Sequence, residues 1–231
     1  MIGNRHLAVL SVVASLALLG SGCATTKQMA LTKEAPAAAL DQQHALALAT
    51  VRVDNQFKTD YQPKVQHLLV KVLDEKGEKL AFQVGKPFRA SEDPAAQYEE
   101  FLVSMSLAPG PHELQFVFTS VNTFLLHGTG FIQVNAKFKA APGQAVYLGR
   151  LEARRRERVG DEPRAGIVIP LIDQGVTGFS GGAWDAQVVD RYDADLALFR
   201  AEFPSLQSVQ VVKQLLDQPK QPPEPPPAKP E

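Results

Sequence analysis

The residue types in this chain that could do chemistry are one thiol, one serine between glycines and a row of arginines. The thiol belongs to Cys23, the only cysteine among 231 residues. It follows an apolar run from Leu7 to Leu19 that has one fixed positive charge, Arg5, ahead of it. As a helix this run is about 20 Å long, at about 1.5 Å per residue, and it falls short of the roughly 30 Å that a spanning helix must cross. The layout is typical of a secretory signal that is removed near Cys23.

The residues around the thiol, Leu18-Leu19-Gly20-Ser21-Gly22-Cys23, resemble the lipobox of bacterial lipoproteins. In that family the cysteine receives a diacylglyceryl group, the signal is cut off and the new amine is acylated. The resemblance covers residues 1–24 and implies a signal peptide at 1–22 with a lipid anchor at Cys23. Gly20 departs from the pattern, because the family usually has leucine there. Ala24 replaces the aspartate that commonly retains such proteins in the inner membrane, so we expect attachment to the outer membrane. The alternative is an ordinary signal whose neighbouring thiol is incidental.

Ser180 lies in Gly178-Phe179-Ser180-Gly181-Gly182, which fits the G-x-S-x-G pattern of a nucleophile between a strand and a helix. The last histidine of the chain, His127, precedes the serine, whereas the base of an α/β-hydrolase follows it. Residues 183–190 also look like a strand rather than the required helix. We therefore favour a glycine-rich loop in a protein that is not an enzyme. A serine hydrolase that uses Ser180 is the alternative.

Four arginines, Arg150, Arg154, Arg156 and Arg158, share strand parity and would form a basic row on one face of an extended strand. Such a row could hold phosphates or carboxylates of an envelope glycolipid or of peptidoglycan through forked hydrogen bonds. The alternative is a charged strand end that discourages edge-to-edge pairing.

Composition excludes several other functions. Removal of the signal peptide removes Arg5, so the mature chain has 23 basic and 25 acidic side chains. This nearly balanced charge does not favour binding to a nucleic acid. With Cys23 acylated, the mature chain has no thiol for a disulfide. The histidines show no metal-binding spacing, and we expect no metal and no cofactor. These histidines are His44, His67, His112 and His127.

The two flanks of the mature chain look unlike a packed domain. Residues 23–50 are rich in alanine and are predicted to be a tether, with a short helix possible over 40–48. Residues 218–231 are rich in proline, which fixes φ and removes backbone donors, so an extended, solvated tail is predicted. A ligand for a proline-binding partner is the alternative for this tail.

Most of residues 51–190 alternate between apolar and polar side chains with a period of two, which is typical of half-buried strands. Turn residues separate two pairs of runs, which are therefore predicted as hairpins: 64–73 with 80–84, and 101–107 with 114–118. Further strands are predicted at 131–138, 146–151, 164–171 and 184–189. Because no helix pattern separates these runs, the sequence predicts an antiparallel β-sandwich of about seven or eight strands.

The segment 100–151 also resembles a group of uncharacterised envelope lipoproteins. Leu107 to Leu114 is similar to their L-x-P-G-x-H/Y-x-L pattern. Phe138, Gly143 and the run Tyr147 to Leu151 are similar to their F-x-x-x-x-G-x-x-x-Y-L-G-x-I/L pattern. The resemblance implies an immunoglobulin- or transthyretin-like sandwich and brings no catalytic residues.

The C-terminal section, residues 191–217, is predicted to be helical. Asp193 is expected to cap a helix over 194–202. The apolar stripe of this helix consists of Leu196, Phe199 and Phe203. A second helix is predicted over 205–217, and it either packs on the sandwich or docks a partner. Its stripe consists of Val209, Val212 and Leu216.

These features predict a protein of the bacterial cell envelope, anchored by a lipid to the outer membrane and facing the periplasm. Its expected role is that of a non-catalytic binding or assembly module. Its partner is expected to be an envelope protein or glycan of unknown identity.

Overall fold

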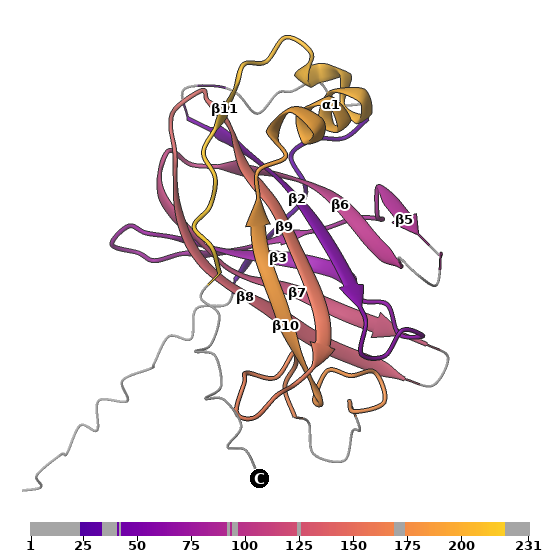
Figure 1. Ribbon diagram of the computed structural model, residues 1–231. Helices are drawn as coiled ribbons and strands as arrows, with labels where there is room; N and C mark the ends of the chain where they lie inside the picture. The colour runs from indigo at the N-terminus through magenta and orange to yellow at the C-terminus, as the bar shows by residue number, and fades with distance from the viewer. Residues whose placement is uncertain are drawn as a thin grey trace, which may run out of the picture.

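The structure is a computed structural model in which residues 24–33, 41, 43–91, 93, 97–123, 126–168 and 174–219 are described. The predicted signal peptide, Cys23 and residues 220–231 of the predicted tail lie outside the described residues. The described residues form two β-sheets with one α-helix, α1 (Tyr192–Glu202), at one end of the molecule (Figure 1). In this part of the chain no helix is long and apolar enough to span a membrane.

The first sheet contains five strands in the order β1-β4-β3-β7-β8. Their bounds are Thr25–Lys27 for β1, Lys64–Val72 for β3, Lys79–Gln83 for β4, Gly110–Asn122 for β7 and His127–Ala140 for β8. All neighbours in this sheet are antiparallel except β1, which lies parallel to β4. The predicted hairpin of residues 64–73 and 80–84 is confirmed as β3 and β4. Asp74 closes its turn, because the carboxylate accepts hydrogen bonds from the backbone N–H groups of Lys76 and Gly77.

The second sheet contains six strands, of which five lie in the order β10-β9-β2-β6-β5 while β11 also pairs with β9. Their bounds are Ala45–Asn55 for β2, Arg89–Ser91 for β5, Tyr98–Leu107 for β6, Ala145–Glu157 for β9, Gly182–Val189 for β10 and Val211–Lys213 for β11. β2 is antiparallel to β6 but parallel to β9. The chain between β2 and β9 contributes strands to the first sheet before it returns to the second. A connection of this length permits the parallel pairing. The predicted mainly-β fold is confirmed, whereas purely antiparallel pairing is wrong because both sheets are mixed.

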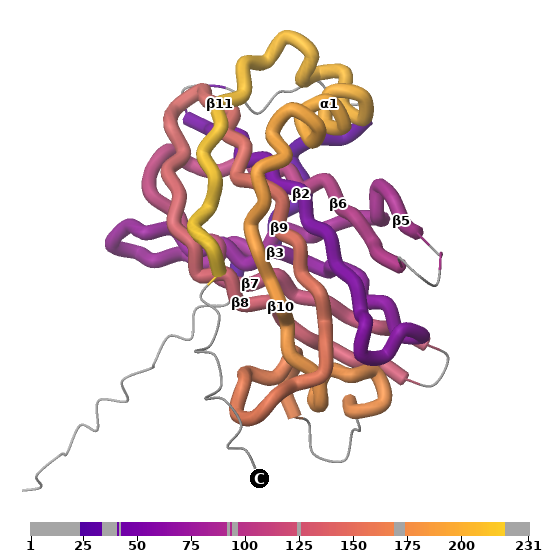
Figure 2. Tube along the Cα trace, viewed as in Figure 1, coloured from indigo at the N-terminus to yellow at the C-terminus, as the bar shows by residue number. Residues whose placement is uncertain are grey.

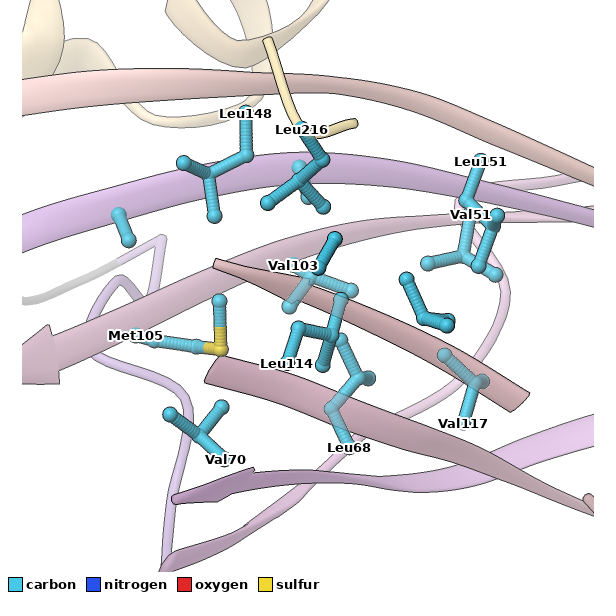
Figure 3. Close-up of a cluster of buried hydrophobic side chains, with 14 of the residues drawn as sticks. Val51, Leu68, Val70, Val103, Met105, Leu114, Val117, Leu148, Leu151 and Leu216 are labelled. Atoms are coloured by element: carbon cyan, nitrogen blue, oxygen red, sulfur yellow. The ribbon is translucent and has the colours of Figure 1, made fainter. Parts of the chain in front are cut away.

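Side chains from both sheets meet in one apolar core. Figure 3 shows Val51, Val103 and Leu148 of the second sheet gathered with Leu68 and Leu114 of the first. All five are at most 1% exposed. The two sheets therefore pack face to face over shared apolar side chains.

The predicted pairing of residues 101–107 with 114–118 is wrong. Residues 101–107 belong to β6 in the second sheet, whereas 114–118 belong to β7 in the first. The Pro109–Gly110 turn therefore carries the chain from one sheet to the other. The turn at Pro142–Gly143 does the same between β8 and β9.

The predicted tether over residues 23–50 is wrong for the described residues. Residues 45–50 form the first half of β2, where the alanines face the core and the leucines face α1. Small side chains suit this central strand because it is covered on both faces. Ahead of it, β1 extends the first sheet, and the backbone N–H of Leu31 donates to Ser104 Oγ at 2.9 Å. The described residues of the segment after Cys23 are thus part of the folded domain.

The C-terminal section is helical only in part. α1 confirms the predicted first helix, with Leu196 and Phe199 buried, but it begins at Tyr192 rather than after Asp193. A 3₁₀ turn, η1 (Pro204–Leu206), and β11 replace the predicted helix over 205–217. The described part of the predicted strand at 164–171, residues 164–168, is irregular, and the remainder lies outside the described residues.

Candidate functional site

Ser180 stands in a turn that precedes a strand. Residues 175–181 are turn, and β10 begins at Gly182, so a strand follows the serine where a nucleophile elbow requires a helix. The backbone carbonyl of Ser180 accepts a hydrogen bond from Arg164 Nη1. Among the described residues, no hydrogen bond joins Ser180 to a histidine. The glycines around it thus belong to a turn that leads into a strand, which differs from the geometry of a nucleophile elbow.

The predicted arginine row lies where strand parity places it. Arg150, Arg154 and Arg156 project from the outer face of β9, opposite the core residues of the same strand, and Arg158 follows the end of β9. The first three are paired with acids from other elements of the fold. Their partners are Glu100 and Asp195 for Arg150, Asp54 for Arg154 and Glu162 for Arg156. The row is therefore largely neutralised by the protein itself.

Arg150 forms the most deeply buried of these ion pairs, beneath α1. Its Nη1 donates to Glu100 Oε2 at 2.9 Å, and its Nε and Nη2 donate to Asp195 in the first turn of α1. The hydroxyl of Tyr147 donates to Asp195 Oδ2 at 2.6 Å. Burial, followed by the hydrogen bond to Asp195 and the charge of that carboxylate, raises the pKa of Tyr147, which keeps this hydroxyl a donor. The network fixes α1 to the sheet and leaves Arg150 unavailable to a ligand.

A β-bulge explains why Tyr147 and Arg150 reach the same carboxylate. On β9, Leu148 and Gly149 together oppose the single residue Ala49 of β2, and Gly149 has φ +107°. The extra residue puts positions 147 and 150 on the same face instead of opposite faces. The Y-L-G-R-L segment is therefore an attachment point for α1.

Arg154 lies in an open, mixed-charge hollow of about 280 Å³ on the outer face of the second sheet. Its Nε lies 3.3 Å from Asp54 Oδ1. Three basic and three acidic side chains line the hollow, together with Ala153 and Gln187. The charged ones are Arg52, Arg154, Arg191, Asp54, Glu152 and Asp185. Because the two signs balance, this hollow does not favour an anion.

Arg156 and Glu162 form a forked ion pair that predicts a pH dependence. Both guanidinium nitrogens lie 2.7 Å from the carboxylate oxygens, and this hydrogen bonding holds the pKa of Glu162 at about 2. The carboxylate is thus ionised in the native state at pH values where the unfolded chain binds a proton. Its stabilising contribution is complete above about pH 4.5 and is lost as the pH falls through about 2.

We expect Glu162→Gln to lower the free energy of unfolding by about 1 kcal/mol at pH 7, as for a pair near solvent. At pH 2 most of this difference should be gone. Urea unfolding followed by circular dichroism at both pH values measures the difference. Glu157→Gln is the matched control, because the Glu157 side chain is exposed and forms no ion pair with a described residue. A Glu162→Gln effect that persists unchanged at pH 2 would contradict the assignment.

The sequence predicts no metal site, because its four histidines outside the signal peptide are scattered along the chain. In the described part of the chain, no three or more histidine, cysteine or acidic side chains are grouped so that they could hold a metal ion. His112 is fully buried and stacks on Phe138, and His67 stacks on Phe118 with ring centroids 4.4 Å apart. These two histidines are packing residues.

Arg155 is a residue whose role sequence reasoning missed. It points to the core side of β9 and is fully buried, with its guanidinium 4.0 Å from the ring centroid of Phe179 and 5.4 Å from that of Trp184. Its Nη2 donates to the carbonyl of Tyr61 at 2.9 Å. Burial lowers its pKa to about 9. The only signal in the sequence was strand parity, which puts Arg155 on the face of the strand opposite the arginine row. Its contacts hold the loop with Phe179 against the end of the sandwich.

Three glutamines bond to the outer backbone edges of β8 and β10. Gln174 Oε1 accepts from the N–H of Thr129 at 2.7 Å. The amide of Gln218 pairs with both backbone groups of Val188, at 2.8 and 2.7 Å. Oriented to satisfy both groups, the amide of Gln214 pairs in the same way with Lys139. Because a glutamine amide has the donor and acceptor of a peptide group, Gln218 and Gln214 each substitute for a residue of a neighbouring strand. Gln174 bonds to β8 through its oxygen alone, since its amide nitrogen donates to the carbonyl of Ile167.

A groove lies between the edges of β8 and β10, in the stretch where none of these glutamines bonds to the strands. Its volume is about 60 Å³, far below the roughly 300–1,000 Å³ of small-molecule sites. Phe131, Ile132 and Gln133 line it from β8, and Trp184 and Ala186 line it from β10. The loop residues Glu162, Pro163 and Arg164, together with Arg156, Ala183 and Pro219, complete the lining. Figure 2 shows the yellow C-terminal segment that leads to Pro219 running beside these strands.

Comparisons with known proteins assign no role to these surfaces, so a role is inferred from their own residues and contacts. No family model matches the chain, and neither a curated protein nor a solved structure matches it.

Proposed function

We propose that this chain is a lipid-anchored protein of the bacterial cell envelope that acts as a non-catalytic binding or assembly module. The lipid is attached at Cys23, and the protein faces the periplasm from the outer membrane. The observation that carries the proposal is the lipobox-like run that ends at Cys23, two residues before a strand of the folded domain. The partner is an envelope protein or glycan.

The start of the fold determines how the anchored protein would sit. Thr25 is already paired with Leu80 of β4, and its hydroxyl donates to Glu78 at 2.9 Å in the turn between β3 and β4. An extended chain covers about 3.3 Å per residue, so a lipid on Cys23 would lie within about 10 Å of this turn. The anchored domain would rest directly against the membrane, with this turn nearest the lipid.

We also propose that the two-sheet body is of the immunoglobulin- or transthyretin-like type. Two layers packed over one core support this assignment. The parallel contacts of β2 and β11 with β9 are additions to that plan.

Intact mass and cell fractionation test the lipid anchor. The mature protein should begin at Cys23 and carry the mass of a diacylglyceryl group and one further acyl group. Cys23→Ser should abolish this mass and release the protein from the membrane fraction. The matched control is the double variant Cys23→Ser with Ser180→Cys, which moves the only thiol into a turn and should stay unlipidated. An unmodified mature terminus, or a Cys23→Ser variant that stays with the membrane, would overturn the proposal.

Crosslinking in intact cells followed by mass spectrometry tests the binding role. We expect the same envelope component to be crosslinked to the anchored protein in repeated experiments. This component should be missing from crosslinked samples of cells that lack the protein. If no component is joined to the protein in cells where it is anchored, the role as a binding or assembly module is wrong, although the anchor itself would stand.

A further inference from the structure

The groove between β8 and β10 is closed at both ends and open in the middle. At one end Ala165 bridges the sheets, because its N–H donates to Gly182 at 2.8 Å and its carbonyl accepts from Phe131 at 3.0 Å. At the other end Gln214 bonds to Lys139 of β8 and Gln218 to Val188 of β10. The space between these closures is the 60 Å³ groove.

The middle of the groove presents unpaired backbone groups. The N–H and C=O of Val188 point away from β9, since Gln218 bonds to both. Backbone direction alternates along an antiparallel strand, so the groups of Trp184 and Ala186 point the same way. No described residue pairs with them. On β8, Phe131 bonds outward to Ala165, so the same alternation leaves Gln133 open.

We propose that the C-terminal segment 220–231 docks in cis, with residues 220–224 lying along this groove. The chain enters the groove at Pro219, which is one of its lining residues. β11 runs parallel to β9, and the backbone N–H groups of Gln214 and Leu216 continue that direction by donating to Tyr147 and Leu148. Continued along this line, the chain passes antiparallel to β10 from Val188 towards Gly182.

The composition of this segment fits the groove. Six of its twelve residues are proline, which has no N–H to leave unpaired, while every proline carbonyl can accept from the open N–H groups of β10. Proline-rich segments bind aromatic-lined grooves at low entropic cost because their φ angles are already fixed. Phe131 and Trp184 provide such a lining, and the small volume suits single proline rings rather than a compact ligand.

The charges also match in position. Arg164 lines the groove near Gly182, is exposed, and forms no ion pair with a described carboxylate. From Pro219 to Glu224 an extended proline-rich chain covers about 15 Å, at about 3.1 Å per residue. From Ala186 to Gly182 β10 covers about 13 Å, at about 3.3 Å per residue. The docked segment therefore brings Glu224 to Arg164.

Trp184 reports on occupancy, because it is the only tryptophan in the chain and lines the groove. The experiment compares the protein with a variant that ends at Pro219. Truncation should shift the emission of Trp184 to longer wavelength and increase its quenching by acrylamide. Amide exchange at Trp184 and Ala186 should become faster by about tenfold. A synthetic peptide of residues 219–231 should reverse these changes. Equal quenching and exchange in the two proteins would overturn the proposal.

Exchanging the charges of residues 164 and 224 distinguishes docking from a general effect of truncation. Glu224→Arg and Arg164→Glu should each reproduce part of the truncation effect, and the double variant should restore protection. Glu231→Arg is the matched control, because position 231 lies beyond the length of the groove and should change nothing. Sedimentation at rising concentration identifies a second copy as occupant. Protection that appears only in a dimer would overturn docking in cis.

Discussion

Replacement of Arg150 by methionine should lower the free energy of unfolding by about 3–5 kcal/mol, the cost of breaking a buried ion pair on one side. Methionine occupies a similar space but removes the cation that forms ion pairs with Glu100 and Asp195. Those carboxylates are 1% and 0% exposed, so they cannot recover their hydration. Urea unfolding monitored by circular dichroism measures the loss, and part of it should appear as early detachment of α1.

Arg154→Met is the matched control for this result. Arg154 projects from the same face of the same strand, but its side chain is 54% exposed and only its Nε approaches Asp54. We expect a loss of at most about 1 kcal/mol. Tyr147→Phe removes one hydrogen bond to Asp195 and should cost about 1 kcal/mol. If Arg150→Met costs no more than Arg154→Met, Arg150 does not hold the helix, and the row would again be a candidate for ligand binding.

Local patterns predicted the elements whose partners lie close in sequence. The β3–β4 hairpin, the alternation of 131–138 and the apolar stripe of α1 were visible because turn residues and periodicity are local properties. Sheet membership is not local, so the turns at Pro109 and Pro142 look like hairpin turns although each connects two sheets. Whether a strand returns to its neighbour or crosses the core depends on residues far along the chain.

Composition misled at both flanks for a physical reason. Alanine-rich residues 45–50 looked too small to be buried, yet a central strand between a core and a helix layer requires small side chains on one face. At the other flank, Val209, Val212 and Leu216 have helical spacing, but the chain there is extended and Leu216 enters the core. Spacing alone does not distinguish an edge segment from a short helix.

The sequence predicted that the arginines of the candidate site share one face of a strand, but not that acidic side chains neutralise them. Sequence placed Arg150, Arg154 and Arg156 on one face, which is correct. Their neutralising partners Asp195 and Asp54 lie 45 and 100 residues away along the chain. No pattern in a single sequence reports such distances, so the row appeared free. The edge-binding glutamines were invisible for the same reason, because each bonds to a strand that another part of the chain provides.

Gly149→Ala should lower the free energy of unfolding by about 3 kcal/mol, through two separable effects. At φ +107° an L side chain is strained, which costs about 1–3 kcal/mol. In addition, the new Cβ would lie 2.6 Å from Val188 Cγ1 on β10, so one of the two strands must move. Urea unfolding measures the total. Because the bulge puts Tyr147 and Arg150 on one face, proteolysis should also cut near α1 sooner in the variant.

Two further variants assign this loss to its causes. Gly160→Ala is the control for backbone strain alone, since Gly160 has φ +57° with no atom within 4 Å of an added Cβ, and it should cost about 1 kcal/mol. Adding Val188→Ala to Gly149→Ala removes the steric contact while keeping the strained φ, so the two changes should cost less together than the sum of the single variants. Strict additivity would mean that the contact with β10 does not restrict residue 149. A Gly149→Ala loss equal to that of Gly160→Ala would mean that the bulge can relax, and that the Y-L-G-R-L segment does not need its glycine to hold α1.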